Sequence, residues 1–134
     1  MDEIIKIVKD IDDKKLKPIY FLMGEEPYYI DKLSDYIETN VLTEEEKGFN
    51  QTVLYGRDIE IEDIISTCRR YPMMSEYQVV IVKEAQDLSR TISNLESYVL
   101  NPTPTTILVI CYKSKTVDKR TTLSKALQKK GLLF

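Results

Sequence analysis

The stretch that decides the fold is PIYFLMGEEPYYIDKL, residues 18–33. Its first half is a continuous apolar run ending at Gly24, which is typical of a short β-strand buried on both faces of a sheet. Between Pro27 and Val41 apolar residues recur at three- and four-residue intervals, which indicates an amphipathic helix. A buried strand that leads directly into a helix is the repeating unit of α/β proteins.

The same alternation of strands and helices continues along the chain. Further strands are predicted at 50–56, 77–85 and 105–112, with a fifth beginning at 132–134, and further helices at 3–16, 58–70, 87–100 and 118–130. We expect Asp58 to cap the helix at 58–70. Five short strands separated by helices predict a three-layer α/β/α domain with a five-stranded, mostly parallel sheet.

Length and composition limit the classes of protein to which the chain can belong. A chain of 134 residues, 43% apolar and 31% charged, is the size and composition of one globular domain. No apolar run approaches the roughly 20 residues of a membrane span, and the acidic, amphipathic opening lacks the pattern of a secretory signal. We therefore expect a cytoplasmic protein with no membrane partner.

The sequence offers few residues for catalysis or metal binding. It contains no histidine and only two cysteines, Cys68 and Cys111. This excludes histidine-based acid/base catalysis and most zinc chemistry, and isolated cysteines are most often small buried apolar residues. We expect no metal, no cofactor and no catalytic residue.

Charge is unevenly distributed along the chain. Residues 1–65 carry 17 acidic and 8 basic side chains, whereas residues 66–134 carry 5 acidic and 11 basic ones. The basic excess is concentrated at 113–130, which could meet phosphates, an acidic protein surface or only solvent. Because the net charge of the chain is −3, we expect weak DNA binding by this chain alone.

The turn after the first strand is where a parallel α/β domain would bind a nucleotide. It reads Gly24, Glu25, Glu26, Pro27, with one glycine and no Lys-Ser/Thr pair, and its two glutamates would repel a triphosphate. A magnesium-binding site would need an acidic residue at the end of the central strand. Lys83 occupies that position here and is followed by Glu84. The layout is that of a P-loop protein whose phosphate-handling elements are missing.

Three segments in their order resemble a known family. PIYFLMGEEPYYIDKL, DIISTCRRYPMMSEYQVVIVKEA and TILVICYKSKTVDKRTTLSKALQKKG are similar to the amino-terminal domain of the delta subunit of bacterial DNA polymerase III, the wrench of the clamp loader. The resemblance implies a P-loop NTPase/AAA+-like domain with a degenerate nucleotide site at residues 24–27. It also implies that residues 1–134 are a single domain of a longer protein whose lid and collar domains are absent here.

The resemblance carries expectations about function and partners. It implies a domain that binds the sliding clamp (beta) and helps to open it for loading on primed DNA, in the bacterial cytoplasm at the replisome. The other implied partners are the delta prime and gamma/tau subunits of the loader, with DNA reached through the assembled complex. No intrinsic enzymatic activity is expected, although the family carries a DNA-directed DNA polymerase name by membership in the holoenzyme. The alternative is a divergent AAA+ nucleotide hydrolase, which would bind ATP with micromolar affinity.

The resemblance assigns the clamp contact to Tyr71, Pro72, Met73, Met74 and Ser75. Met73 and Met74 match the position of two adjacent large apolar side chains, often Leu-Phe in the family, that enter a hydrophobic pocket of the clamp. From the residues alone, Pro72 helps to end the preceding helix and favours an extended residue before it. The bland alternative is that the two adaptable thioethers fill gaps in the core.

Two further groups of charged residues have two interpretations each. Arg69 and Arg70 either flank the clamp pocket or stabilise the carboxyl end of their helix through its dipole. Asp118, Lys119 and Arg120 resemble the family pattern before the last helix. They either form a face toward DNA or a neighbouring subunit, or they include a helix cap at Asp118.

Overall fold

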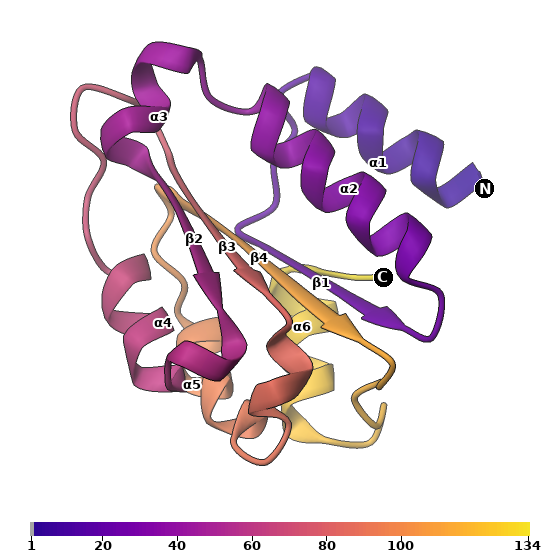
Figure 1. The fold of residues 1–134 in the computed structure, drawn as a ribbon. Coiled ribbons are helices and arrows are strands. Elements are labelled where there is room, and N and C mark those ends of the chain that lie inside the picture. Colours follow the sequence, from indigo (N-terminus) through magenta and orange to yellow (C-terminus); the bar gives the residue numbers. More distant parts are fainter. Residues whose placement is uncertain (1) are drawn as a thin grey trace.

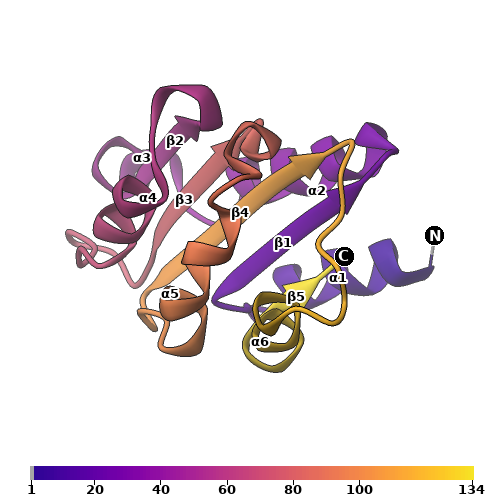
Figure 2. The ribbon, with the colours of Figure 1, turned by 90° about the horizontal axis from the view of Figure 1, so that it is seen from below.

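The computed structural model describes residues 2–134 and has a five-stranded sheet with the strand order β2-β3-β4-β1-β5 (Figures 1 and 2). All neighbouring strands are parallel. The strands are β1 (Ile19–Gly24), β2 (Gln51–Tyr55), β3 (Gln78–Lys83), β4 (Thr106–Lys113) and β5 (Leu132–Leu133). The predicted five-stranded parallel sheet is therefore confirmed.

Helices cover both faces of this sheet. The α-helices are α1 (Asp2–Asp12), α2 (Pro27–Asn40), α3 (Glu44–Asn50), α4 (Ile61–Cys68), α5 (Glu96–Leu100) and α6 (Thr122–Lys130). Short 3-10 helices are η1 (Gly56–Asp58), η2 (Ala85–Leu88) and η3 (Ile92–Leu95). Helices α1 and α2 lie on one face, whereas α4, α5 and α6 lie on the other (Figures 1 and 2). The three-layer α/β/α architecture is as predicted.

Two apolar cores follow from the alternation of side chains along the strands. In β1, Tyr20 and Leu22 pack toward α1 and α2, while Ile19 and Phe21 pack toward α4 and α6. All four are buried. A strand buried on both faces reads as a continuous apolar run, which explains why residues 18–24 identify the fold.

Several predicted helix boundaries are wrong. Helix α1 ends at Asp12 rather than near residue 16, and a turn follows in which Lys14 has a φ of 64°. The N-cap of helix α4 is Glu60, whose backbone N–H donates to Asp63 Oδ2 at 2.8 Å, so Asp58 is not its cap. Helix α6 starts four residues after Asp118, because the Thr121 side chain accepts the hydrogen bond from Ser124 N at 3.2 Å.

Two regions differ in type from their prediction. The segment 87–100 is broken into 3-10 turns and the short α5, because its Ser, Thr and Asn residues favour caps and turns over helix interiors. Helix α3 was not predicted at all. It begins at a capping box in which the Thr43 side chain accepts from Glu46 N and the Glu46 side chain accepts from Thr43 N.

Candidate protein-binding tip

The connector between α4 and β3, residues 69–77, exposes a run of large apolar side chains. The exposed fractions are 79% for Tyr71, 60% for Met73 and 100% for Met74. Neither methionine therefore belongs to a core, and the alternative that the two thioethers fill gaps in the core is wrong. Contiguous exposed apolar side chains on a soluble domain mark an interaction surface, so we call residues 71–75 together with α3 the tip.

The backbone of the tip is held by a buried amide from α3. Asn50 is 3% exposed, and its Nδ2 donates to the Met73 carbonyl oxygen at 2.9 Å and to the Glu46 carbonyl oxygen at 3.0 Å. Its Oδ1 accepts from Met73 N at 2.7 Å. One side chain thus satisfies both backbone groups of Met73, which fixes the position of that residue relative to α3.

A second link joins Ser75 to the same helix. The Ser75 hydroxyl oxygen lies 2.7 Å from Glu46 Oε2, and the other carboxylate oxygen accepts from Thr43 N at 2.9 Å. The Thr43 backbone N–H, and after it the Ser75 hydroxyl, lower the pKa of Glu46 below its ordinary value. Ionised Glu46 therefore connects the start of α3 to the carboxyl side of the tip.

The base of the tip rests on buried polar side chains of the sheet. Gln78 Nε2 lies 2.6 Å from the Arg70 carbonyl oxygen and 2.9 Å from Thr106 Oγ1. The Thr106 hydroxyl in turn donates to the Cys68 carbonyl oxygen at 2.7 Å. These bonds satisfy carbonyls that the end of α4 leaves without helical partners, so the connector leaves the helix in a defined direction.

The two arginines before the tip have different environments. The Arg69 guanidinium lies over the Tyr98 ring, 4.6 Å from its centroid, and donates to the Asn101 carbonyl oxygen at 2.6 Å. Its charge is thus engaged in packing the end of α4 against the α5 region. The side chain of Arg70 is exposed, so Arg70 is the better placed of the two to face a partner.

The turn at Met74 has an unusual backbone conformation. Met74 has a φ of 56°, in the left-handed region that residues other than glycine seldom occupy. A conformation of this kind costs of order 1–3 kcal/mol and persists only where the surroundings determine it. The anchors at Met73 and Ser75, on either side, provide that constraint and turn the Met74 side chain fully into solvent.

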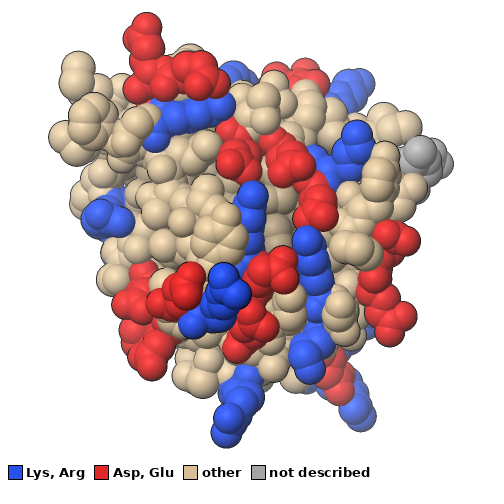
Figure 3. Space-filling view, viewed as in Figure 1, with Lys and Arg blue, Asp and Glu red and all other residues tan. Residues whose placement is uncertain are grey.

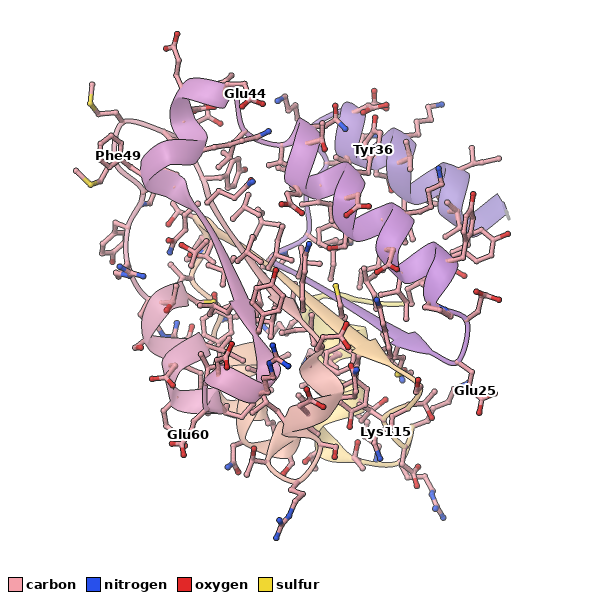
Figure 4. All side chains as sticks on the ribbon, viewed as in Figure 1. Glu25, Tyr36, Glu44, Phe49, Glu60 and Lys115 are labelled. Carbon is pink, nitrogen blue, oxygen red and sulfur yellow. The ribbon has the colours of Figure 1, made fainter. Side chains whose placement is uncertain are left out.

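Phe49 is a tip residue that the sequence did not reveal. It lies on α3 with 79% of its surface exposed, and it lines one shallow depression of about 380 Å³ with Met73, Met74, Asn50, Glu45 and Glu46. In Figure 4 the ring points away from the domain, with sulfur atoms on both sides of it. Figure 3 shows this corner as uncharged surface with carboxylates along its edge. The segment 44–50 has no apolar stripe, so only its proximity to the connector could have identified it.

The turn at Gly24 to Pro27 holds a carboxylate where a phosphate-binding protein would hold its ligand. Gly24 has a φ of 132°, and Pro27 is the first residue of α2. Glu26 is the N-cap of α2, and its Oε1 accepts from Tyr28 N at 3.1 Å. The exposed Glu25 adds a second negative charge beside it. The Glu26 carboxylate thus accepts from a backbone N–H group at the start of α2, where a bound phosphate would otherwise accept.

The carboxyl ends of β3 and β4 carry charges that neutralise one another. Lys113 Nζ lies 2.8 Å from Asp31 Oδ1 and 3.6 Å from Glu84 Oε2. The hydrogen bond that Lys113 donates to the Asp31 carboxylate is the main reason that the pKa of Lys113 is raised. Lys83 pairs in the same way with Glu38 at 3.7 Å. Both lysines at the strand ends are therefore paired with carboxylates of α2.

The charged group before α6 is separate from the tip. The Arg120 guanidinium donates to Asp118 Oδ2 at 2.8 Å, and Arg120 N donates to Asp118 Oδ1 at 2.9 Å. This pairing lowers the pKa of Asp118 and raises that of Arg120. Lys119 is exposed beside them. Asp118 therefore organises the loop before α6 without capping the helix.

The two thiols are buried and poorly ionised. Burial raises the pKa of Cys68 to about 12 and that of Cys111 to about 11. Among residues 2–134, no group of three or more His, Cys, Asp or Glu side chains is placed to hold a metal ion. Within the same range, no helix is long and apolar enough to cross a bilayer.

The strand order and the helix layers define the class of protein first. The fold is similar to that of a DNA polymerase III gamma subunit-related protein from Thermotoga maritima, with a TM-score of 0.65 and 14% identity over 98% of this chain and 44% of that one. It is also similar to Thermotoga maritima RuvB T158V, with a TM-score of 0.54 and 16% identity over 98% of this chain and 42% of that one. At these identities the similarity concerns the fold alone, which is AAA+-like.

The sequence then identifies the family. The profile of the family described as DNA polymerase III, delta subunit, matches residues 20–134, so the chain belongs to this family. It is 27% identical to DNA polymerase III subunit delta of Bacillus subtilis (strain 168), over 98% of this chain and 40% of that protein. The solved Bacillus subtilis DNA clamp loader delta protein has a TM-score of 0.82 and 27% identity, over 98% of this chain and 41% of that one. The chain therefore spans about two fifths of the length of these relatives.

Proposed function

We propose that this chain is the part of a clamp-loader delta subunit that binds the sliding clamp and helps to open it for loading on primed DNA. The observation that carries the proposal is the pair of adjacent exposed thioethers, Met73 and Met74, on a connector whose backbone is anchored on both sides. A rigid apolar projection loses little conformational entropy when it enters a pocket. In this proposal Tyr71, Pro72 and Ser75 shape the projection, and Arg70 lies at its flank.

The two methionines can supply a useful share of the binding free energy. Complete burial of one Met side chain is worth roughly 1.5–3 kcal/mol, so the pair contributes roughly 3–6 kcal/mol. At 1.4 kcal/mol for each factor of ten, this corresponds to about 10²- to 10⁴-fold in affinity. Loss of both side chains should therefore bring clamp binding below detection in an assay with a micromolar limit.

We further propose that the domain acts without hydrolysing ATP. The Glu26 carboxylate at the start of α2 and the lysine–carboxylate pairs at the strand ends support this proposal, because they oppose binding of a triphosphate. Because the chain spans about two fifths of the length of its relatives, we also propose that residues 1–134 form one domain of a longer delta subunit in the bacterial cytoplasm. Its other partners are the delta prime and gamma/tau subunits and, through the assembled loader, DNA. The exposed segment 118–120 is a candidate face for a neighbouring loader subunit or for DNA.

The test is a binding measurement with the cognate sliding clamp immobilised on a sensor surface. Met73→Ala/Met74→Ala should abolish binding while leaving the melting temperature within about 2 °C of the wild type, because neither side chain contributes to a core. Ile5→Ala is the matched control, since Ile5 is an exposed apolar residue on α1, far along the chain from the tip. Wild-type protein that does not bind the clamp, or a double variant that binds as well as wild type, would refute the proposal. Micromolar ATP binding by calorimetry would refute the inactive nucleotide site.

A further inference from the structure

We infer that the clamp-contact surface extends beyond the connector onto α3, with Phe49 as a third apolar anchor and Glu45 as an acidic contact at its edge. The inference rests on the proposed function, because it takes the sliding clamp as the partner. It adds a requirement on that partner: an apolar surface wide enough for three anchors, with positive charge where it meets α3.

Phe49 has no packing role that explains its position. A phenylalanine ring with 79% of its surface in water is exceptional on a domain with two well-filled cores. It borders the same depression as Met73 and Met74, so burial of the methionines against a partner surface would bring that surface to the ring as well. Aromatic side chains are enriched among the residues that dominate binding free energy.

The relative position of Phe49 and the methionines is fixed by hydrogen bonds. Asn50, the next residue after Phe49, bonds to both backbone groups of Met73. Glu46, one helical turn before Asn50, bonds to the Ser75 hydroxyl. The two segments therefore form one rigid unit, and a partner that binds one of them meets the other in a constant geometry.

The charges around this unit indicate the sign of the partner surface. Glu44 pairs with Lys47 at 2.9 Å, and the Glu46 carboxylate is engaged by Thr43 and Ser75. Glu45 is exposed and borders the depression, and it makes no salt bridge within the described part of the chain. A positive group on the partner would complement it and speed association.

The same charges disfavour a second copy of this chain as the occupant. In a two-fold symmetric contact the same patch faces itself. Both halves of such a contact would carry Glu45 and the other carboxylates at the edge of the patch, and two surfaces with the same sign of charge oppose association.

The experiment compares variants of the 134-residue chain on the immobilised clamp. Phe49→Ala should raise the dissociation constant at least tenfold, and Phe49→Leu, which keeps an apolar side chain, should recover at least half of that loss on a logarithmic scale. Glu45→Lys should slow association at least threefold at low salt, and the difference should shrink as salt rises. Ile5→Ala should bind as wild type does, and all variants should retain the wild-type melting temperature.

The outcomes separate this inference from the proposed function. Failure of the wild type to bind the clamp would overturn both. Binding that is lost in Met73→Ala/Met74→Ala but unchanged in Phe49→Ala would overturn the role of Phe49 alone. Faster association of Glu45→Lys would overturn the expectation that the clamp is positively charged where it meets α3. Dimerisation of the free chain in sedimentation velocity, abolished by Phe49→Ala, would assign the surface to a second copy instead.

Discussion

Replacing Asn50 with alanine tests whether α3 holds residues 71–75 of the tip in their binding conformation before a partner arrives. The change removes the hydrogen bonds of the side chain to Met73 N, to the Met73 carbonyl oxygen and to the Glu46 carbonyl oxygen. Each is worth roughly 0.5–1.5 kcal/mol net. Three such bonds are together worth roughly 1.5–4.5 kcal/mol. We therefore expect a loss of about 2–3 kcal/mol in the free energy of unfolding, which corresponds to about 8–12 °C in melting temperature for a domain of this size.

The same variant should weaken clamp binding even though only 3% of Asn50 is exposed. Without the hydrogen bonds from Asn50, Met73 and Met74 become ordered only on binding, which costs about 0.5–1.5 kcal/mol of binding free energy for each side chain. The sum of roughly 1–3 kcal/mol predicts a dissociation constant that rises about 5- to 150-fold. The rise should appear mainly in the association rate, because fewer encounters find the tip in its binding conformation.

Urea unfolding, clamp binding and amide hydrogen exchange at Met73 together test this reasoning. The matched control is Asn40→Ala, since within residues 2–134 the Asn40 amide donates only to the Tyr36 carbonyl oxygen, at the exposed end of α2. It should change stability by less than about 1 kcal/mol and leave binding unchanged. An Asn50→Ala protein with wild-type affinity and an equally protected Met73 amide would refute the anchoring role of Asn50.

Two further predictions concern the tip. Because the pKa of Glu46 is lowered by donors from Thr43 and Ser75, its stabilising effect is present above the ordinary Glu value of 4.5 and is lost as pH falls through the lower folded-state pKa. The melting temperature of the wild type should therefore fall more steeply below pH 4.5 than that of Glu46→Gln, and parallel curves would contradict the assignment. Oxidation of Met73 and Met74 to sulfoxides by hydrogen peroxide should raise the dissociation constant for the clamp at least tenfold, because the sulfoxides are polar. Met73→Leu/Met74→Leu should resist the treatment, and oxidised wild type with full affinity would show that the thioethers lie outside the interface.

The sheet could be predicted from the sequence because its signal is local. Strands β1, β3 and β4 are buried on both faces, and each reads as an uninterrupted apolar run. Helix α2 was equally evident, because its buried residues recur with helical periodicity. The helix boundaries were less accurate because they depend on single hydrogen bonds, such as the cap at Thr121 instead of Asp118.

The tip could be predicted only in part, for a physical reason. Met73 and Met74 stand out as large apolar residues that follow a proline in a short connector. What holds them comes from residues 23 to 29 positions earlier in the chain, Asn50 and Glu46, in a helix without an apolar stripe. A buried asparagine that bonds to a distant backbone leaves no periodic trace in a sequence. Phe49 was missed for the same reason, since its position beside the methionines depends on that bond.

The proposed mechanism sets a demand on the size of the contact surface. A ligand shifts a closed ring toward an open one only through its difference in affinity for the two states. A shift from 1:99 to 99:1 needs about 5.5 kcal/mol of such difference, close to the upper limit of the roughly 3–6 kcal/mol that the two methionines can supply by burial. The methionines alone could achieve this only if almost all their contact were made in the open state. A third anchor at Phe49 enlarges the available binding free energy, and a clamp stabilised in its open form should therefore lose more affinity on Phe49→Ala than a closed one does.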